Sequence, residues 1–217
     1  MKRDETTKER LLRAGERLFA EHGIERVRLR EINALAGQRN SSALHYHFGS
    51  RDGLVLAILG AHQSEMDEEL EPHLDALEAQ AEPPTICEIV EVAIYPLARQ
   101  LATQSGRDFL RLLPQVLDLV TTPVREGTTL RLAKQSARII ALLERCLGHL
   151  PVEVRRERMM TYVLMITSLF VERATEVEAG RRRGLTDEQF AAHACDVITG
   201  ALEAPSTVAL RSAGAVR

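Results

Sequence analysis

Three consecutive residues, His45, Tyr46 and His47, and a fourth, Arg51, carry the groups whose types and spacing point most clearly to chemistry. Imidazole, phenol and guanidinium groups donate hydrogen bonds to phosphate oxygens and to the edges of bases. Two histidines at i and i+2 point to different faces of a helix, so they make a poor pair of metal ligands. The segment therefore predicts contact with a nucleic acid, and we expect neither a catalytic site nor a bound metal.

A short helix predicted over residues 29–36 would brace this segment. Leu29, Ile32 and Ala36 share one face of that helix, as packing against a core requires. Gly37 follows them and tolerates the positive φ of a sharp turn.

A second short helix is predicted after the polar turn GQRNSS, with Ser41 or Ser42 as its cap. Leu44 and Phe48 lie one turn apart and would anchor it, which leaves its other faces to hydrogen-bond donors. Two short helices joined by a tight turn predict a helix-turn-helix, whose second helix enters the major groove of DNA.

Helical spacing recurs along the rest of the chain, and no alternating pattern typical of strands is convincing. Thr6 and Glu9 can form a capping box for a first helix over 7–22, and Ser50 can cap a long fourth helix. We predict an all-α protein of about nine helices, three short ones in front and a larger bundle behind. The remaining helices are predicted near 85–103, 107–120, 124–148, 152–180 and 187–203, and the domains are predicted as 1–50 and 51–204, with a flexible tail over 205–217.

The composition is that of a globular protein, with 45% hydrophobic and 27% charged residues in 217. The three cysteines are widely spaced in apolar helical patterns, so we expect reduced, buried thiols. The polar N-terminus lacks the apolar segment of a signal peptide, and no apolar run approaches the ~20 residues of a membrane span. We expect a cytoplasmic protein with no membrane partner and no cofactor.

The charge is divided unevenly along the chain. The net charge is −3, but residues 1–52 carry 11 Lys and Arg against 8 Asp and Glu, and the remainder carries 17 against 23. A basic head of +3 on an acidic body of −6 suits a protein that touches phosphates with one end only.

The segments LFAEHG, REINALAG and HYHFGSRDGL together resemble the N-terminal domain of the TetR family of bacterial transcriptional regulators. The resemblance is specific over residues 7–58 and architectural beyond them. It implies an all-α homodimer that binds double-stranded DNA and whose C-terminal bundle takes a small-molecule effector. It also implies phosphate contacts from Tyr46 and Arg51. The full set of predicted DNA-binding residues is Arg28, Arg30, Gln38, Arg39, Asn40, Ser41, Ser42, His45, Tyr46, His47 and Arg51.

Two positions depart from the family pattern. The turn GQRNSS is one residue longer than the commoner form, which leaves the register of 38–42 open. Arg28 stands where a capping Ser or Thr is usual, so a cap is lost and a charge near the DNA is gained. Simpler interpretations remain open: Tyr46 could pack against the fourth helix, and Arg26, Arg28 and Arg30 could form a solvated face.

The stretch MMTYVLMITSLFV, residues 159–171, is apolar on all sides, which predicts a core on one side and a partner subunit on the other. The alternative is that the helices predicted over 152–180 and 187–203 are both internal to a single subunit. The predicted dimer interface comprises Tyr162, Ile166, Leu169, Phe190, Ala194, Val197, Ile198 and Ala201. The resemblance also implies an effector pocket, for which the candidate lining residues are Tyr95, Phe109, Leu112, Leu113, Val116, Met159 and Met160.

These features predict a one-component transcriptional regulator, a repressor that a small apolar effector releases from a near-palindromic operator. An architectural DNA-binding protein without a regulatory ligand is the alternative. An enzyme in a helical bundle is a weaker one, because His62, His73, His149 and His193 form no pattern.

Overall fold

The computed structural model describes residues 6–38, 40, 42–116, 134–181 and 184–208. Over these residues the chain forms nine α-helices and one 3-10 helix, with no strand, which confirms the prediction of an all-α protein. Arg39, Ser41 and the end of the predicted tail lie outside the described residues. So do residues 117–133, on which parts of the helices predicted near 107–120 and 124–148 fall.

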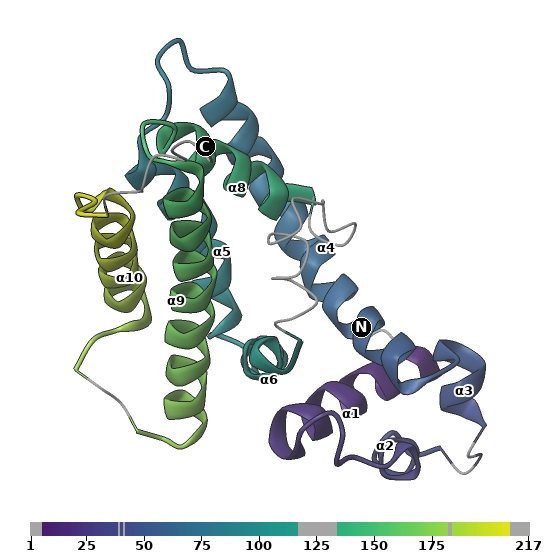
Figure 1. Cartoon of the computed structure of the whole chain (residues 1–217). Coiled ribbons are helices and arrows are strands. Elements are labelled where there is room, and N and C mark those ends of the chain that lie inside the picture. The colour runs from purple at the N-terminus through teal and green to yellow at the C-terminus, as the bar shows by residue number, and fades with distance from the viewer. Residues whose placement is uncertain (1–5, 39, 41, 117–133, 182–183, 209–217) are drawn as a thin grey trace, which may run out of the picture.

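The first three helices form a small head at the lower right of Figure 1. Helix α1 covers Thr7–His22 and begins with the predicted capping box between Thr6 and Glu9. Helices α2 (Leu29–Leu35) and α3 (Ala43–Phe48) are short, as the spacing predicted. Their apolar faces meet in one core, whose fully buried members include Leu11, Phe19, Ile32 and Leu44.

Helix α4, Arg51–Glu78, runs obliquely from the head to the top of the bundle (Figure 1). Ser50 caps it through a hydrogen bond from the Gly53 N–H to the serine Oγ of 3.0 Å. The first two turns of α4, with Leu54 and Ile58, belong to the core of the head, and its later turns belong to the core of the bundle. Helix α4 therefore contributes residues to both cores, and the boundary between the head and the bundle falls within α4.

The bundle comprises α5 (Ile86–Gln100), α6 (Gln104–Leu112), the 3-10 helix η1 (Leu113–Val116), α8 (Lys134–Cys146), α9 (Val152–Glu178) and α10 (Asp187–Glu203). Helices α9 and α10 stand side by side at the left of Figure 1, with α10 on the side away from the head. Helix α6 lies between α9 and α1 and contacts both. This places α6 at the junction of the head and the bundle.

Candidate nucleic-acid interface

Helix α2 is fixed from its inner face. Ile32 is fully buried and Ala36 is buried beside it, as the predicted bracing role requires. Arg28 occupies the N-cap without a side-chain hydrogen bond, and the Glu31 carboxylate instead accepts the Arg28 N–H at 2.9 Å. The expected loss of the cap at Arg28 is therefore confirmed, and Glu31 compensates for part of it. The side chains of Arg28 and Arg30 remain exposed.

The turn between α2 and α3 is held by backbone and amide groups. Gly37 adopts φ +69°, which confirms the need for glycine there. The Gln38 N–H donates to the Asn33 carbonyl at 2.8 Å, and the Ser42 N–H donates to Asn40 Oδ1 at 2.9 Å. Ser42 occupies the N-cap position of α3, but its side chain makes no capping hydrogen bond, and Ser41, the other predicted cap, lies outside the described residues. The Asn40 amide oxygen therefore holds the residue just before the helix and does not cap α3 itself.

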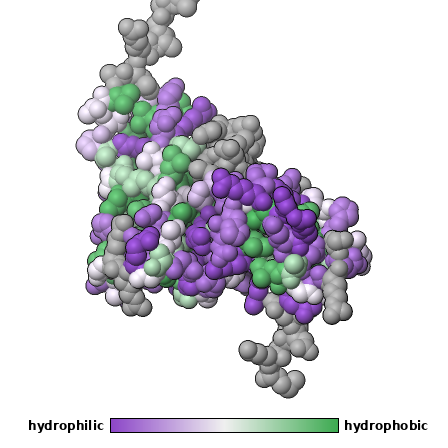
Figure 2. All heavy atoms as spheres, turned by 90° about the horizontal axis from the view of Figure 1, so that it is seen from below, coloured by the Kyte–Doolittle hydropathy of each residue, from purple (hydrophilic) through white to green (hydrophobic). Residues whose placement is uncertain are grey.

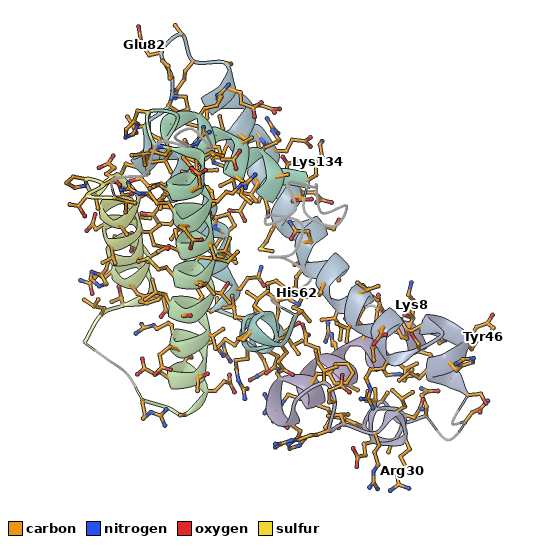
Figure 3. All side chains as sticks on the ribbon, in the orientation of Figure 1. Lys8, Arg30, Tyr46, His62, Glu82 and Lys134 are labelled. Carbon is orange, nitrogen blue, oxygen red and sulfur yellow. The ribbon has the colours of Figure 1, made fainter. Side chains whose placement is uncertain are left out.

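Helix α3 presents its polar side chains outward. Leu44 is buried and Phe48 is half-buried, which anchors one face of the helix. Tyr46 is 85% exposed and points away from the body of the protein (Figure 3), so it does not pack against α4. His47 is half-buried and touches the Tyr46 ring edge-on, with the ring centroids 5.0 Å apart.

The exposed polar groups of α2 and α3 lie on the outer surface of the head. Arg30 points away from α2 at the lower side of Figure 3, and Tyr46 points outward from α3. Figure 2, viewed from below, shows hydrophilic side chains over most of the head, at the right. Ser42 and His45 are exposed as well. The structure thus gathers most of the predicted DNA-binding residues on the outside of one small domain.

Arg51 differs from the others because its guanidinium is engaged within the head. Its Nη1 donates to the Glu25 carbonyl at 3.0 Å, and its Nη2 donates to the Val27 carbonyl at 2.8 Å. Nη1 also lies 3.3 Å from the Glu25 carboxylate. Arg51 therefore ties the α1–α2 loop to the start of α4, a role that the sequence pattern did not predict.

A buried polar cluster at the head–bundle junction was also missed. Glu16 Oε1 lies 2.5 Å from His62 Nε2, and Glu16 Oε2 accepts a hydrogen bond from the Ser105 hydroxyl at 2.5 Å. The other imidazole nitrogen lies 3.1 Å from Gln100 Oε1. The Phe109 ring stacks on His62 at 4.3 Å. These residues come from α1, α4, α6 and the end of α5, so no short sequence window contains the pattern.

A second set of charges surrounds Asp108 beside this cluster. Burial raises the pKa of Asp108, and the Gln104 amide, Arg17 and Arg111 offset part of that effect. Arg17 Nη1 lies 3.4 Å from Asp108 and 3.6 Å from Glu178 of α9. Helix α1 is therefore connected by charge to both α6 and α9.

The predicted pocket residues do not share one core. Phe109 and Met159 lie in the core of the bundle, whereas Leu112 and Val116 lie in the core of the head. Tyr95 is 38% exposed on α5. Leu113 and Met160 are half-buried.

The predicted interface residues differ in how far they are buried. Tyr162, Ala194 and Ile198 are buried in the core of the chain itself, so the structure gives these three a core role in place of an interface role. Val197 is 40% exposed, and Leu164, which the pattern did not single out, is 43% exposed. The others, Ile166, Leu169, Phe190 and Ala201, are half-buried.

Other kinds of site receive no support from the described part of the chain. None of its His, Cys, Asp and Glu side chains form a group of three or more suited to a metal ion. None of its helices is long and apolar enough to cross a membrane.

The fold and the outer face of the head define the class of protein: a helical protein with an N-terminal helix-turn-helix DNA-binding domain. Residues 11–58 match the family described as bacterial regulatory proteins, tetR family. These residues are thus a TetR-family DNA-binding domain, and the chain as a whole has the fold of TetR-family transcriptional regulators. This confirms the resemblance that the sequence motifs indicated.

Solved structures support the fold over nearly the whole chain. A TetR-like transcriptional regulator from Rhodococcus sp. RHA1 matches with a TM-score of 0.58 and 16% identity, covering 93% of this chain and 96% of that one. SmeT, the repressor of the Stenotrophomonas maltophilia multidrug efflux pump SmeDEF, matches with a TM-score of 0.58 and 19% identity, covering 95% and 97%. Mycobacterium smegmatis AmtR matches with a TM-score of 0.54 and 20% identity, covering 91% and 89%. No curated protein sequence matches the chain.

Proposed function

We propose that the protein is a one-component repressor that binds a near-palindromic operator as a homodimer and is released by a small apolar molecule. The observation that carries the proposal is the 85% exposure of Tyr46, on a short helix whose opposite face is anchored by the buried Leu44. A large side chain exposed to that degree on a rigid helix is placed to contact DNA and not to hold the fold together.

The proposed contacts fall into two kinds, those with the DNA backbone and those with the edges of bases. Tyr46 suits a phosphate oxygen, whereas Ser42 and His45, at the start and outer face of α3, suit base edges. Arg30 on the neighbouring helix adds a long, charged side chain beside them. Arg51 remains a proposed phosphate contact, although its hydrogen bonds to Glu25 and Val27 give it a bracing role as well.

The homodimer would use the outer faces of α9 and α10. Leu164 and Val197 are exposed apolar side chains on these two neighbouring helices. A two-fold dimer would present two reading heads about 34 Å apart, roughly one turn of DNA, to a palindromic site.

Repression with release by an effector is supported by comparison. SmeT is described as a repressor, and a complex of SmeT with triclosan is among the structures with the same fold, at a TM-score of 0.58 and 18% identity. An effector can shift the protein only by its differential affinity for two conformers. The buried cluster around Glu16 and His62 is where such conformers would differ, because it joins the head to the bundle.

Footprinting on the DNA beside the protein's own gene tests the proposal. A regulator should protect one discrete, near-palindromic stretch, and the protection should survive at physiological salt. Diffuse binding that salt abolishes would instead indicate the rival function, an architectural DNA-binding protein without a regulatory ligand.

A further inference from the structure

A groove with a volume of about 710 Å³ lies where the head meets the bundle. The α1–α2 loop, the first turns of α4 and the end of η1 form its walls. Of the residues predicted to line an effector pocket, Val116 is the one that lines this groove. The groove therefore differs from the pocket expected inside the bundle.

Both apolar and charged residues line the groove. Ile24, Val55, Leu56 and Val116 supply apolar lining, and Leu56 is 43% exposed. A volume of this size is in the range of about 300–1,000 Å³ that small-molecule sites occupy. Covering Leu56 would remove exposed apolar surface from water, which favours binding of an apolar molecule.

The charged residues that line the groove carry both signs. Glu25, Arg26 and Asp52 line the groove, and the Glu25 carboxylate is paired with Arg51 at 3.3 Å. Arg26 and Asp52 then leave one charge of each sign. An added ionic group would therefore meet one attractive and one repulsive partner. This balance favours an uncharged ligand.

One wall of the groove is the segment that places α2. Gln115 Oε1 accepts the Ile24 N–H at 2.8 Å, and Gln115 Nε2 donates to the Phe19 carbonyl at 3.3 Å. Arg51 holds the next part of the same loop through the carbonyls of Glu25 and Val27. The loop leads directly into α2, so a molecule in the groove would press on the segment that positions α2.

We propose that this groove is a binding site for a small, uncharged, largely apolar molecule, and that its occupancy alters DNA binding through the Gln115 contact with the α1–α2 loop. The effect on DNA rests on the proposed function, whereas the binding site itself does not.

The protein contains no tryptophan, so a single introduced indole reports on one location. Leu56→Trp places it in the groove, and Tyr95→Trp places it on α5 among the residues predicted for the bundle pocket. We expect 1-adamantanol to change the emission of Leu56→Trp saturably and to leave that of Tyr95→Trp unchanged. Its charged analogues, 1-adamantylammonium and 1-adamantanecarboxylate, should bind at least several-fold more weakly. A response confined to Tyr95→Trp, or none from Leu56→Trp, would overturn the site.

Calorimetry of the protein without an introduced tryptophan tests whether the groove binds 1-adamantanol in the absence of the indole. Leu56→Arg replaces a half-exposed side chain, so the fold should be retained while the groove gains a charge and loses volume. The heat of 1-adamantanol binding should be lost in Leu56→Arg, and retention of full affinity would contradict the proposal.

A DNA-binding titration separates this inference from the proposed function. With 1-adamantanol, the intact protein should lose affinity for its operator several-fold. At a concentration of 1-adamantanol that calorimetry shows to saturate Gln115→Ala, the change in DNA affinity should be abolished in this variant. An unchanged effect in Gln115→Ala would refute the coupling. Failure of the ligand-free protein to bind any discrete DNA site would refute the proposed function. The fluorescence result would still show whether the groove binds 1-adamantanol.

Discussion

Glu16 of α1 and His62 of α4 meet inside the protein, with Oε1 of the carboxylate 2.5 Å from Nε2 of the imidazole. Both side chains are almost fully buried. Glu16 also accepts the Ser105 hydroxyl from α6, so one carboxylate links three helices. Because α1 belongs to the head and α6 to the bundle, the pair fixes how the two parts meet.

His62→Ala should lower the free energy of unfolding by roughly 1–3 kcal/mol, because it leaves a buried carboxylate without one of its two partners. Urea denaturation measures the change. His73→Ala is the matched control, since His73 is an exposed histidine on the same helix. Equal effects of the two substitutions would show that the buried pair does not stabilise the junction.

Tyr46→Ala should weaken binding to DNA while leaving the melting temperature within about 1 °C, because the side chain is largely exposed. Fluorescence anisotropy with a labelled duplex and a thermal melt give the two readouts. Leu44→Ala provides the contrast on the same helix: removal of a buried leucine costs about 2–5 kcal/mol of stability. A loss of stability in Tyr46→Ala comparable to that in Leu44→Ala would contradict the assignment of Tyr46 to the DNA surface.

The head could be predicted closely from sequence because its determinants are local. Capping by Thr6 and Ser50, the positive φ of Gly37 and the anchoring by Leu44 each depend on residues within a few positions of one another. These features follow from hydrogen-bond geometry and helical period, which a sequence displays directly.

The contacts that join distant segments could not be predicted in this way. Glu16 and His62 are 46 positions apart, and Gln115 is 91 positions from Ile24. The sequence also could not show which side of an all-apolar helix faces inward. Tyr162 and Leu164 lie two positions apart on α9, yet the first is buried and the second is 43% exposed. Only packing distinguishes the two faces.

Arg51→Lys should separate the two roles of this residue. A lysine keeps the charge but cannot replace the planar guanidinium that reaches the Glu25 and Val27 carbonyls together. We expect the salt dependence of DNA binding to be retained, with stability lowered by about 1 kcal/mol. Arg51→Ala should in addition weaken binding to all sequences and reduce the salt slope by about one. An unchanged slope in Arg51→Ala would assign Arg51 to bracing alone.

Glu178 predicts a dependence of stability on pH. Burial alone would raise its pKa, but hydrogen bonds from Arg107 and Gln104 outweigh this and lower the pKa below its usual value. A carboxyl group with a lowered pKa in the folded state stabilises the protein above its unfolded pKa, and this stabilisation is lost as the pH falls through the folded pKa.

Glu178→Gln should therefore destabilise the protein at pH 7 and make less difference as the solution is acidified below about pH 4. Urea denaturation at a series of pH values measures this trend. Glu157→Gln, which changes an exposed carboxylate on the same helix, should alter stability little. A difference between wild type and Glu178→Gln that stays constant with pH would contradict the ion-pair explanation.

The homodimer is tested at the outer faces of α9 and α10. Leu164→Arg and Val197→Arg each place a charge on an apolar side chain that is already about 40% exposed in the single chain. The fold should therefore be retained, while burial of an unpaired charge between two subunits becomes costly. Sedimentation should show wild type at about twice the mass of the variants, and operator affinity should fall with the loss of the second head. Leu35→Arg, at a 57% exposed leucine in the head, should leave the mass unchanged. If both bundle variants sediment as wild type does, the subunits meet elsewhere.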